Sequence, residues 1–231
     1  MRVLILGATG PVGIALTKLL IERLSSENKS DGVEHKIILF VRSPQKLPAD
    51  VIFSPLVTVI NAQLSDIDKL EEALEGVDAV LSALGPSVSK GPFHPSGEPL
   101  AKAYQGVLGA MRKRGVKRLF ALGTASNTAE EDKSDVRFGA LVTGVATLAR
   151  NAYKDVVAIG KLITAAEDLD WTIVRVPVLN SKDTKEIHAG YIGDGKTGTI
   201  LARIGFAVFI IGELFNDTPL WIRKKPMICS V

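Results

Sequence analysis

The sequence predicts an α/β fold built on a doubly wound parallel sheet, with a small C-terminal elaboration. Short apolar runs alternate with segments of helical periodicity, which is typical of a parallel sheet covered by helices on both faces. A glycine-rich turn stands between the first apolar run and the first helical segment. The 231 residues are 46% hydrophobic and 23% charged, as in an ordinary globular protein. We therefore expect one domain, with a frame over residues 1–180 and an elaboration over residues 181–231.

Six apolar runs predict buried strands, and five segments with apolar residues at helical spacing predict helices. The expected strands are Val3–Leu6, Lys36–Val41, Val57–Ile60, Ala79–Ala83, Arg118–Leu122 and Trp171–Val176. The expected helices are Pro11–Leu24, Ile67–Leu74, about Leu100–Arg114, about Phe138–Leu169 and Ile204–Phe215. Polar or Gly/Pro-rich composition predicts a surface excursion over Ser25–His35, a long loop over Gly85–Pro99, a solvated loop over Asn127–Asp135 and an extended tail.

Charge and cysteine content exclude several classes of protein. The net charge is +3, from 28 basic and 25 acidic residues, which is too balanced for nucleic-acid binding by charge alone. One cysteine, Cys229, excludes an intramolecular disulfide and a cysteine-based zinc site, and favours a reducing compartment. The longest apolar run, Ile204–Gly212, is about half of the ~20 residues that a membrane span needs. Gly7, Gly10 and Gly13 interrupt the apolar N-terminus, so it does not resemble a signal peptide. We expect a cytoplasmic protein.

The glycine-rich turn is the most informative motif. Gly7, Gly10 and Gly13 are spaced by three residues, directly after the first strand and at the head of the first helix. Glycine permits the tight turn and lets a pyrophosphate approach the backbone, and the helix N-terminus presents free N–H groups to it. A plain turn is the alternative, but the strand and helix on either side satisfy the context that the motif requires. The turn therefore predicts a Rossmann-type dinucleotide site.

The end of the second strand distinguishes the two dinucleotides. NAD-preferring sites place an acidic residue there for the ribose hydroxyls, whereas this chain has Arg42 and Ser43. A guanidinium binds phosphate oxygens in bidentate fashion, and Lys46 stands close enough in sequence to assist. A surface arginine on a loop is the alternative interpretation of Arg42. The sequence favours NADP(H) over NAD(H).

These residues, together with three further segments, resemble the atypical short-chain dehydrogenases, most of all the NmrA-like and biliverdin-reductase-B-like NAD(P)-binding proteins. The further segments are Gly76–Gly85, Gly115–Arg118 and Asp170–Arg175. The resemblance covers roughly residues 1–180. It implies fold and cofactor, and says little about substrate.

The resemblance also implies a role for individual residues at the ends of the strands. The pyrophosphate would lie on residues 7–13, including Thr9, Pro11 and Val12, and Ala62, Gln63 and Leu64 would pack on adenine. The family often has an aspartate in that adenine segment, which this chain lacks. The remaining expected contacts to the ribose and nicotinamide come from Ala83, Leu84, Gly85, Thr124, Ser126, Val176, Pro177, Val178 and Leu179.

Catalytic residues are harder to assign. Reductases of the wider superfamily usually carry a tyrosine that acts as general acid, with a lysine four residues later. Lys161 matches that lysine, but Val157 stands four residues before it and has no proton to give. Tyr153 is one turn earlier, about 12 Å from Lys161 along a straight helix. Lys161 would then bind the ribose without acid catalysis, or be a surface lysine, with Tyr153 a packed aromatic residue.

The three histidines do not settle the question of an acid. His94, in the Gly/Pro-rich loop, is a candidate to protonate the substrate, although a lone loop histidine is usually exposed and inert. His35 and His188 stand in polar stretches, and the three have no metal-ligand spacing. We expect no bound metal.

Three hypotheses about function remain open. The first is an NADP(H)-dependent oxidoreductase that transfers hydride to a small, largely apolar carbonyl, quinone or enone. The second is a non-catalytic NADP(H)-binding redox sensor that binds a partner protein, and the third is a redox-neutral isomerase or lyase on the same scaffold. A small-molecule substrate and no nucleic acid or membrane are expected, in a monomer or homodimer. The basic residues 223–225 are expected to form a short solvated loop, and the Ile204–Phe215 helix to pack on the sheet or on a second subunit.

Overall fold

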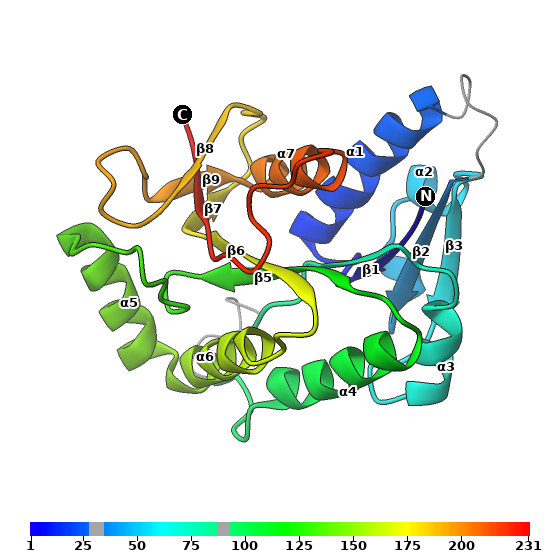
Figure 1. Ribbon diagram of the computed structural model, residues 1–231, viewed down its shortest axis with the longest axis horizontal. Helices are drawn as coiled ribbons and strands as arrows, with labels where there is room; N and C mark the ends of the chain where they lie inside the picture. Colours follow the sequence, from blue (N-terminus) through cyan, green and yellow to red (C-terminus); the bar gives the residue numbers. More distant parts are fainter. Residues whose placement is uncertain (28–34, 87–92) are drawn as a thin grey trace.

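A single mixed sheet organises the computed structural model, which describes residues 1–27, 35–86 and 93–231 (Figure 1). Eight described strands lie in the order β3-β2-β1-β4-β5-β6-β10-β8. The first six in this order are parallel to their neighbours, and the chain reverses direction of winding between β1 and β4. Their bounds are β1 Arg2–Leu6, β2 Lys36–Val41, β3 Val57–Asn61, β4 Ala79–Ser82, β5 Arg118–Thr124 and β6 Asp170–Val176. This is the arrangement of a Rossmann-type fold.

The six predicted strands are confirmed, with small differences at their ends. β5 runs two residues further than expected, to Thr124, because it stays in register with β6 up to Val176. β4 ends at Ser82, one residue before the expected Ala83. The expected excursion Ser25–His35 and loop Gly85–Pro99 lie in part outside the described residues.

The C-terminal tail was predicted only as extended, and it proves to be part of the sheet. β10 (Met227–Ser230) lies between β6 and β8 (Ile187–Gly190), parallel to the first and antiparallel to the second. A separate pair, β7 (Val178–Asn180) and β9 (Ile200–Ala202), forms a small parallel sheet beside it. The C-terminal elaboration therefore adds two strands, β10 and β8, to the sheet beyond β6.

Helices cover both faces of the sheet (Figure 1). On one face, α1 (Pro11–Glu27), α2 (Ala49–Ile52) and α7 (Arg203–Leu214) bury aliphatic and aromatic side chains such as Leu20 and Phe206. On the other, α3 (Ile67–Ala73), α4 (Pro99–Lys113) and α6 (Arg150–Thr164) do the same with Tyr104 and Ile163. α7 thus packs on the sheet and on α1. This agrees with the expectation that the Ile204–Phe215 helix packs on the sheet.

The long helix expected over Phe138–Leu169 is wrong in one respect, because the chain forms two helices there. α5 (Val136–Leu148) ends at Ala149, whose φ of −133° and ψ of 51° leave the helical region, and α6 begins at the next residue. With a single residue between them, the apolar spacing continues almost unbroken, so periodicity alone does not reveal the break. The turn at Ala149 lets α6 lie against the sheet while α5 lies beside it with most of its residues exposed.

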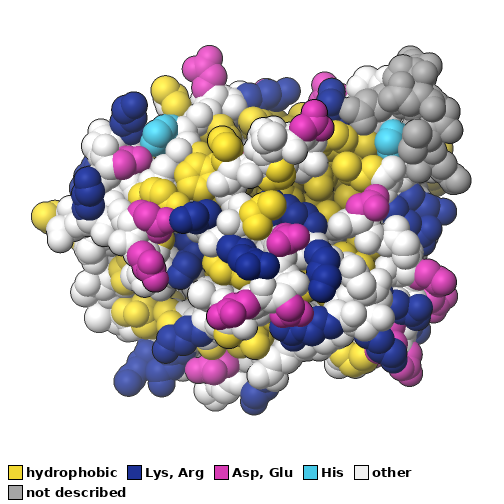
Figure 2. All heavy atoms as spheres, viewed as in Figure 1, with side chains coloured by type: hydrophobic (Ala, Val, Ile, Leu, Met, Phe, Trp, Pro, Cys, Tyr) yellow, Lys and Arg dark blue, Asp and Glu magenta, His cyan; other side chains and the backbone are white. Residues whose placement is uncertain are grey.

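No helix in the described part of the chain has the length and hydropathy for a membrane crossing. Basic and acidic side chains are interspersed over the face that Figure 2 shows.

Candidate cofactor-binding site

The glycine turn joins β1 to α1 in a conformation that requires glycine at two positions. Gly7 has a φ of +77°, and a Cβ there would lie 2.9 Å from the carbonyl carbon and oxygen of Ala83. A Cβ on Gly13 would collide with the carbonyl oxygen of Gly7 and lie 2.8 Å from the Cα of Ala8. The turn is therefore packed tightly against the end of β4 and against itself, and a side chain is excluded at Gly7 and Gly13.

The first turn of α1 offers unused hydrogen-bond donors. The backbone N–H of Ile14 donates to Gly10 O, and that of Gly10 donates to Gly7 O. The N–H groups of Val12 and Gly13 have no acceptor in the described parts of the chain, and Pro11 has no N–H. Two free N–H groups at the positive end of a 17-residue helix, in a turn with three glycines, fit a pyrophosphate. The residues present therefore suit a dinucleotide.

The other expected cofactor residues lie on the same edge of the sheet. Each follows the carboxyl end of a parallel strand, where open α/β sheets bind their ligands. Arg42 and Ser43 follow β2, Gln63 and Leu64 follow β3, and the remainder follow β4, β5 and β6: Ala83, Leu84, Gly85, Ser126, Pro177 and Val178, with Thr124 the last residue of β5. The topology thus brings together all of the expected contact residues except Lys161, which belongs to α6.

The end of β2 presents a cation to solvent. Arg42 is exposed, and Ser43 precedes a short 3₁₀ helix, Pro44–Lys46, that turns the chain away from the sheet. The side chain of Ser43 makes no capping hydrogen bond to this helix, so its hydroxyl is available to a ligand.

A small cavity of about 10 Å³ lies where β4 and β5 end against α6. Leu84, Gly85 and Thr124 line one side and Val156 the other. Beneath it, the Ser82 hydroxyl is 2.6 Å from the hydroxyl of Tyr104, whose pKa burial raises to about 12. Tyr104 is therefore a neutral structural group that fixes the end of β4.

Tyr153 and Lys161 both lie on α6, eight residues apart, with no break in the helix between them. Tyr153 is half-buried and Lys161 exposed. Lys161 lines an open groove of about 430 Å³ together with Ser126, Val157 and Glu167, and no residue of the glycine turn takes part in it. Contact between Lys161 and the cofactor ribose stays a prediction.

His94 differs from the exposed residue that a lone loop histidine suggests. It is 7% exposed, and its Nε2 lies 2.8 Å from Oδ2 of Asp155, which is completely buried on α6. The same carboxylate accepts hydrogen bonds from the backbone N–H groups of Leu100 (3.1 Å) and Ala101 (2.8 Å) in the first turn of α4. Asn151 donates to the carbonyl oxygen of His94 at 3.0 Å. The prediction of an exposed histidine is wrong because Asp155, 61 residues away, supplies a partner.

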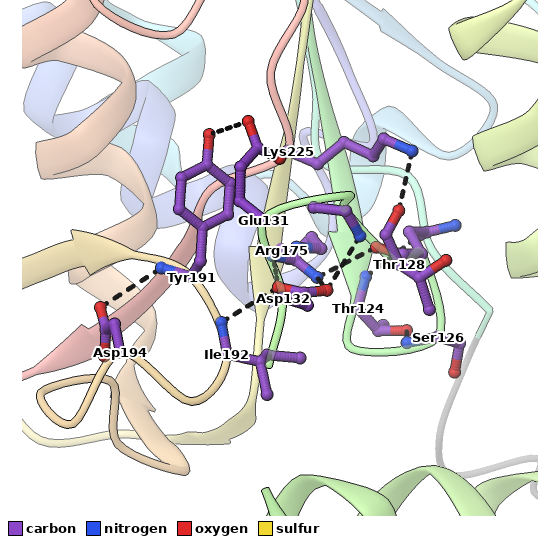
Figure 3. Close-up of polar contacts among 12 residues, drawn as sticks. Thr124, Ser126, Thr128, Glu131, Asp132, Arg175, Tyr191, Ile192, Asp194 and Lys225 are labelled. Carbon is purple, nitrogen blue, oxygen red and sulfur yellow. Dashed lines mark hydrogen bonds and ion pairs between the residues drawn. The ribbon is translucent and has the colours of Figure 1, made fainter. Parts of the chain in front are cut away.

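The loop after β5 is also more ordered than predicted (Figure 3). The guanidinium of Arg175, on β6, is fully buried and donates to both carboxylate oxygens of Asp132, at 2.6 and 2.8 Å. It also donates to the carbonyl oxygen of Asn127 at 3.2 Å. Asp132 accepts the N–H of Ile192 as well, so this loop holds the C-terminal elaboration. The expectation of a solvated loop over Asn127–Asp135 is confirmed for most of its residues, which are exposed, but Asn127 and Asp132 accept hydrogen bonds from the buried Arg175.

Of the basic residues 223–225, Lys224 and Lys225 contact the same loop, whereas Arg223 donates to the carbonyl oxygen of Leu169. Lys224 pairs with Glu131 at 2.8 Å, and Lys225 donates to the carbonyl oxygen of Thr128 at 2.8 Å. The hydroxyl of Tyr191 also donates a hydrogen bond to Glu131. Burial is the largest cause, and the Glu131 carboxylate the next, of a rise in the pKa of Tyr191 to about 12. Arg223 and Lys224 are exposed, as the expected solvated loop requires, and the hydrogen bonds of Lys224 and Lys225 also attach the tail to the loop after β5.

Comparison with known proteins identifies the family. A family model described as NAD(P)H-binding matches residues 7–217. The chain belongs to this NAD(P)H-binding family. Among solved structures, an ethylated short-chain dehydrogenase/reductase from Veillonella parvula has a TM-score of 0.76 at 16% identity, covering 99% of this chain and 94% of that one. A wide-type short-chain dehydrogenase/reductase from the same organism, in complex with NADP, has a TM-score of 0.73 at 16% identity with the same coverage.

A Rossmann-fold NAD(P)-binding protein from Shigella flexneri is also similar, with a TM-score of 0.66 at 22% identity, covering 99% of this chain and 93% of that one. No curated protein matches the sequence. Membership of the family assigns NAD(P)H binding to the chain, and the similar structures share its Rossmann-type fold.

Asp155, Asn127 and the Asp132–Arg175 pair are the polar residues of this edge that the sequence analysis did not single out. One signal was present for Asp155. The buried face of α6 carries Ala152, Val156, Ile159 and Ile163, and Asp155 stands on that face. An acidic residue at a buried helical position needs a partner, although the sequence does not say which.

Proposed function

We propose that this member of the NAD(P)H-binding family is an NADP(H)-dependent oxidoreductase that reduces a small, largely apolar carbonyl, quinone or enone. The observation that carries the proposal is the glycine turn, where two free N–H groups of α1 stand beside Gly7 and Gly10, which have no side chain. A bound reduced nicotinamide would supply the hydride, and the protein would bind and orient the two reactants. A cytoplasmic location belongs to the same proposal, since the lone Cys229 is a free, buried thiol.

The preference for NADP(H) rests on the end of β2. An exposed guanidinium and a free hydroxyl follow that strand, with Lys46 in the next turn and no acidic side chain between them. Such a set suits a 2′-phosphate and offers no carboxylate to accept hydrogen bonds from the two ribose hydroxyls of NAD. The fold resembles that of a Veillonella parvula enzyme crystallised with NADP, which is consistent with this preference.

Thermal unfolding with NADP, NADPH, NAD and NADH in parallel tests both parts. At about 100 times the dissociation constant, a bound nucleotide adds about 2.7 kcal/mol of stability, or about 5–10 °C in Tm for a chain of this length. We expect that shift with NADP and NADPH and a smaller one with NAD and NADH. No shift with any of the four would refute the proposed site.

The variant Arg42→Ala tests the phosphate contact. It should reduce the shifts with NADP and NADPH and leave those with NAD and NADH unchanged. Arg114→Ala is a matched control, because Arg114 is exposed at the other end of the fold, just after α4. Equal losses for phosphorylated and unphosphorylated nucleotides would contradict the assignment of Arg42.

A redox-sensing, non-catalytic binder is the second candidate, and Val157 is the observation that favours it. This apolar residue lines the groove beside Lys161, at the position where a reductase would carry its acid. Binding of NADPH without turnover on a broad carbonyl and quinone panel would support this candidate. A sensor must also bind NADP and NADPH with different affinity, since a ligand without differential affinity shifts no population.

A further inference from the structure

The buried pair His94–Asp155 lies at the edge of the sheet that holds the cofactor residues. α4 follows β4 and α6 precedes β6, and both run antiparallel to the strands, so their first turns lie at the carboxyl edge. His94 belongs to the segment between β4 and α4, and Asp155 to the first half of α6. The residue after Asp155, Val156, lines the small cavity with Thr124 and Gly85. The pair thus lies one residue along α6 from a wall of the cavity that Thr124, an expected nicotinamide contact, also lines.

The contacts of Asp155 define how the imidazole is held. Two backbone N–H groups of α4 and one ring nitrogen surround the carboxylate, which acts as acceptor in all three contacts. The ring therefore donates from Nε2 to Asp155. Asn151 fixes the main chain of His94 through its carbonyl oxygen, so ring and backbone are both constrained. A histidine oriented by a buried carboxylate is an arrangement suited to proton transfer from the opposite ring nitrogen.

Capping of α4 does not by itself account for the histidine. Asp155 alone satisfies the free N–H groups of Leu100 and Ala101, and the positive end of α4 favours its negative charge. The imidazole contributes no bond to α4. The imidazole adds one further hydrogen-bond donor and a group that can gain and lose a proton. Val157, at the position of the usual tyrosine, can do neither.

We propose that His94 is the proton donor of the reduction, with Asp155 as the residue that positions its ring; this rests on the proposed function. The carbonyl carbon gains hydride and forms a C–H bond, and the electron pair of the C=O π bond moves to oxygen. Nδ1 of the His94 imidazolium transfers its proton to that oxygen, giving an alcohol. Reduced nicotinamide is the two-electron reductant and leaves oxidised, and the imidazole regains a proton from water.

His188 provides an internal control. It also pairs with an aspartate, Asp194, at 3.0 Å, but both side chains are 27% exposed and lie at β8 and the following loop. The chain has three histidines, so proton NMR of the imidazole rings is simple to assign. The variants His35→Gln and His188→Gln identify two of the signals, and the third belongs to His94 even if no His94 variant folds.

Addition of NADPH to the wild-type protein is the first measurement. We expect the ring signals of His94 to shift and those of His35 and His188 to stay in place. If NADPH raises Tm but the His94 signals do not move, His94 is not at the reacting centre and this inference is wrong while the proposed function stands. If NADPH leaves Tm unchanged, the proposed function fails, and the inference with it.

Turnover of a substrate found on the carbonyl and quinone panel is the second measurement. His94→Gln retains an N–H that can donate to Asp155 and removes the transferable proton. We expect kcat to fall about 10²–10⁴-fold, the usual contribution of general acid catalysis. KM for NADPH should not change, and His188→Gln should match the wild type. A wild-type kcat in His94→Gln would overturn the inference, as would NADPH binding without turnover of any panel compound by the wild type.

Discussion

The guanidinium of Arg175 is fully buried and is neutralised by Asp132, which reaches it from 43 positions earlier in the chain. Arg175 lies on β6, on the side of the sheet covered by α4 and α6, where Trp171 and Ile173 of the same strand enter the apolar core. Asp132 accepts two bonds from it and one each from the N–H groups of Ala129 and Ile192. The pair therefore joins the central sheet, the loop after β5 and the C-terminal elaboration (Figure 3).

Removal of the negative charge at this pair should be strongly destabilising. Asp132→Asn leaves the Arg175 charge buried without a counter-charge, and breaking a buried pair in this way costs about 3–5 kcal/mol. Urea unfolding at neutral pH measures the loss. Asp168→Asn is the control, because the Arg112–Asp168 pair is also bidentate but its side chains are 45% and 46% exposed. Similar losses for the two variants would contradict the importance of burial.

The same pair predicts a dependence of stability on acid pH. Burial opposes the ionisation of Asp132, but hydrogen bonds from Arg175 and from the N–H of Ala129, with the Arg175 charge, outweigh it and lower its pKa. A carboxyl with a folded pKa below its unfolded value of about 3.9 stabilises fully above that value, and this contribution is lost as pH falls through the folded pKa. The difference in unfolding free energy between wild type and Asp132→Asn should thus be constant near neutral pH and shrink below pH ~4. A difference that does not change down to pH 2 would contradict this.

The glycine turn predicts a selective loss of nucleotide binding. Gly13→Ala places a methyl group against the carbonyl oxygen of Gly7, so the turn must open and its N–H groups move. We expect the thermal shift with NADPH to disappear and the free protein to be less stable. Gly109→Ala, on the exposed face of α4 with no atom within 4 Å of the new Cβ, should stabilise by about 0.5–1 kcal/mol and keep the shift. Retention of the shift in Gly13→Ala would argue against a pyrophosphate at this turn.

Asn127 predicts a coupling between β5 and α6. Its Oδ1 accepts the N–H of Thr124 at 3.1 Å and its Nδ2 donates to the carbonyl oxygen of Val156 at 2.9 Å, so it joins two walls of the small cavity. A Cβ on Gly160 would collide with Nδ2. Gly160→Ala should therefore destabilise by about 1–3 kcal/mol, measured by urea unfolding.

A double-mutant cycle with Asn127→Ala isolates this contact. In the Asn127→Ala background the space for a methyl group exists, and the cost of Gly160→Ala should largely vanish. Gly139→Ala, on α5 with open space around its Cβ, serves as the control for the effect of alanine in a helix. Additive costs of Gly160→Ala and Asn127→Ala would show that the two residues do not interact.

The strands, the glycine turn and the edge of the sheet that carries the expected cofactor residues could be predicted from the sequence, because each depends on residues that are close together in the chain. Runs such as Lys36–Val41 have no polar face, so they form strands buried on both sides, and Gly7 and Gly13 stand where a strand must turn into a helix. Parallel strands place their carboxyl ends on one edge, which brought Arg42 and Thr124 to the expected side without any knowledge of contacts.

Contacts between distant residues were decided by the tertiary structure alone. Ala149 ends one helix and Arg150 begins the next, with no change in the apolar spacing. Met227–Ser230 forms a strand because it pairs with the edge of β6 on one side and with β8 on the other. The partner of a buried charge depends on which loop reaches it, so neither Asp132 for Arg175 nor Asp155 for His94 could be chosen from the sequence.

The sequence by itself therefore determined an NAD(P)-binding α/β frame with the glycine turn at its centre. The tertiary structure decided which polar residues are buried at the edge of that frame and how the C-terminal 50 or so residues attach to it. The physical reason is the range of the interactions. Hydrophobic periodicity and turn chemistry depend on residues a few positions apart, so they can be recognised in the sequence. A buried ion pair such as Arg175–Asp132 forms only after folding has brought the two residues together.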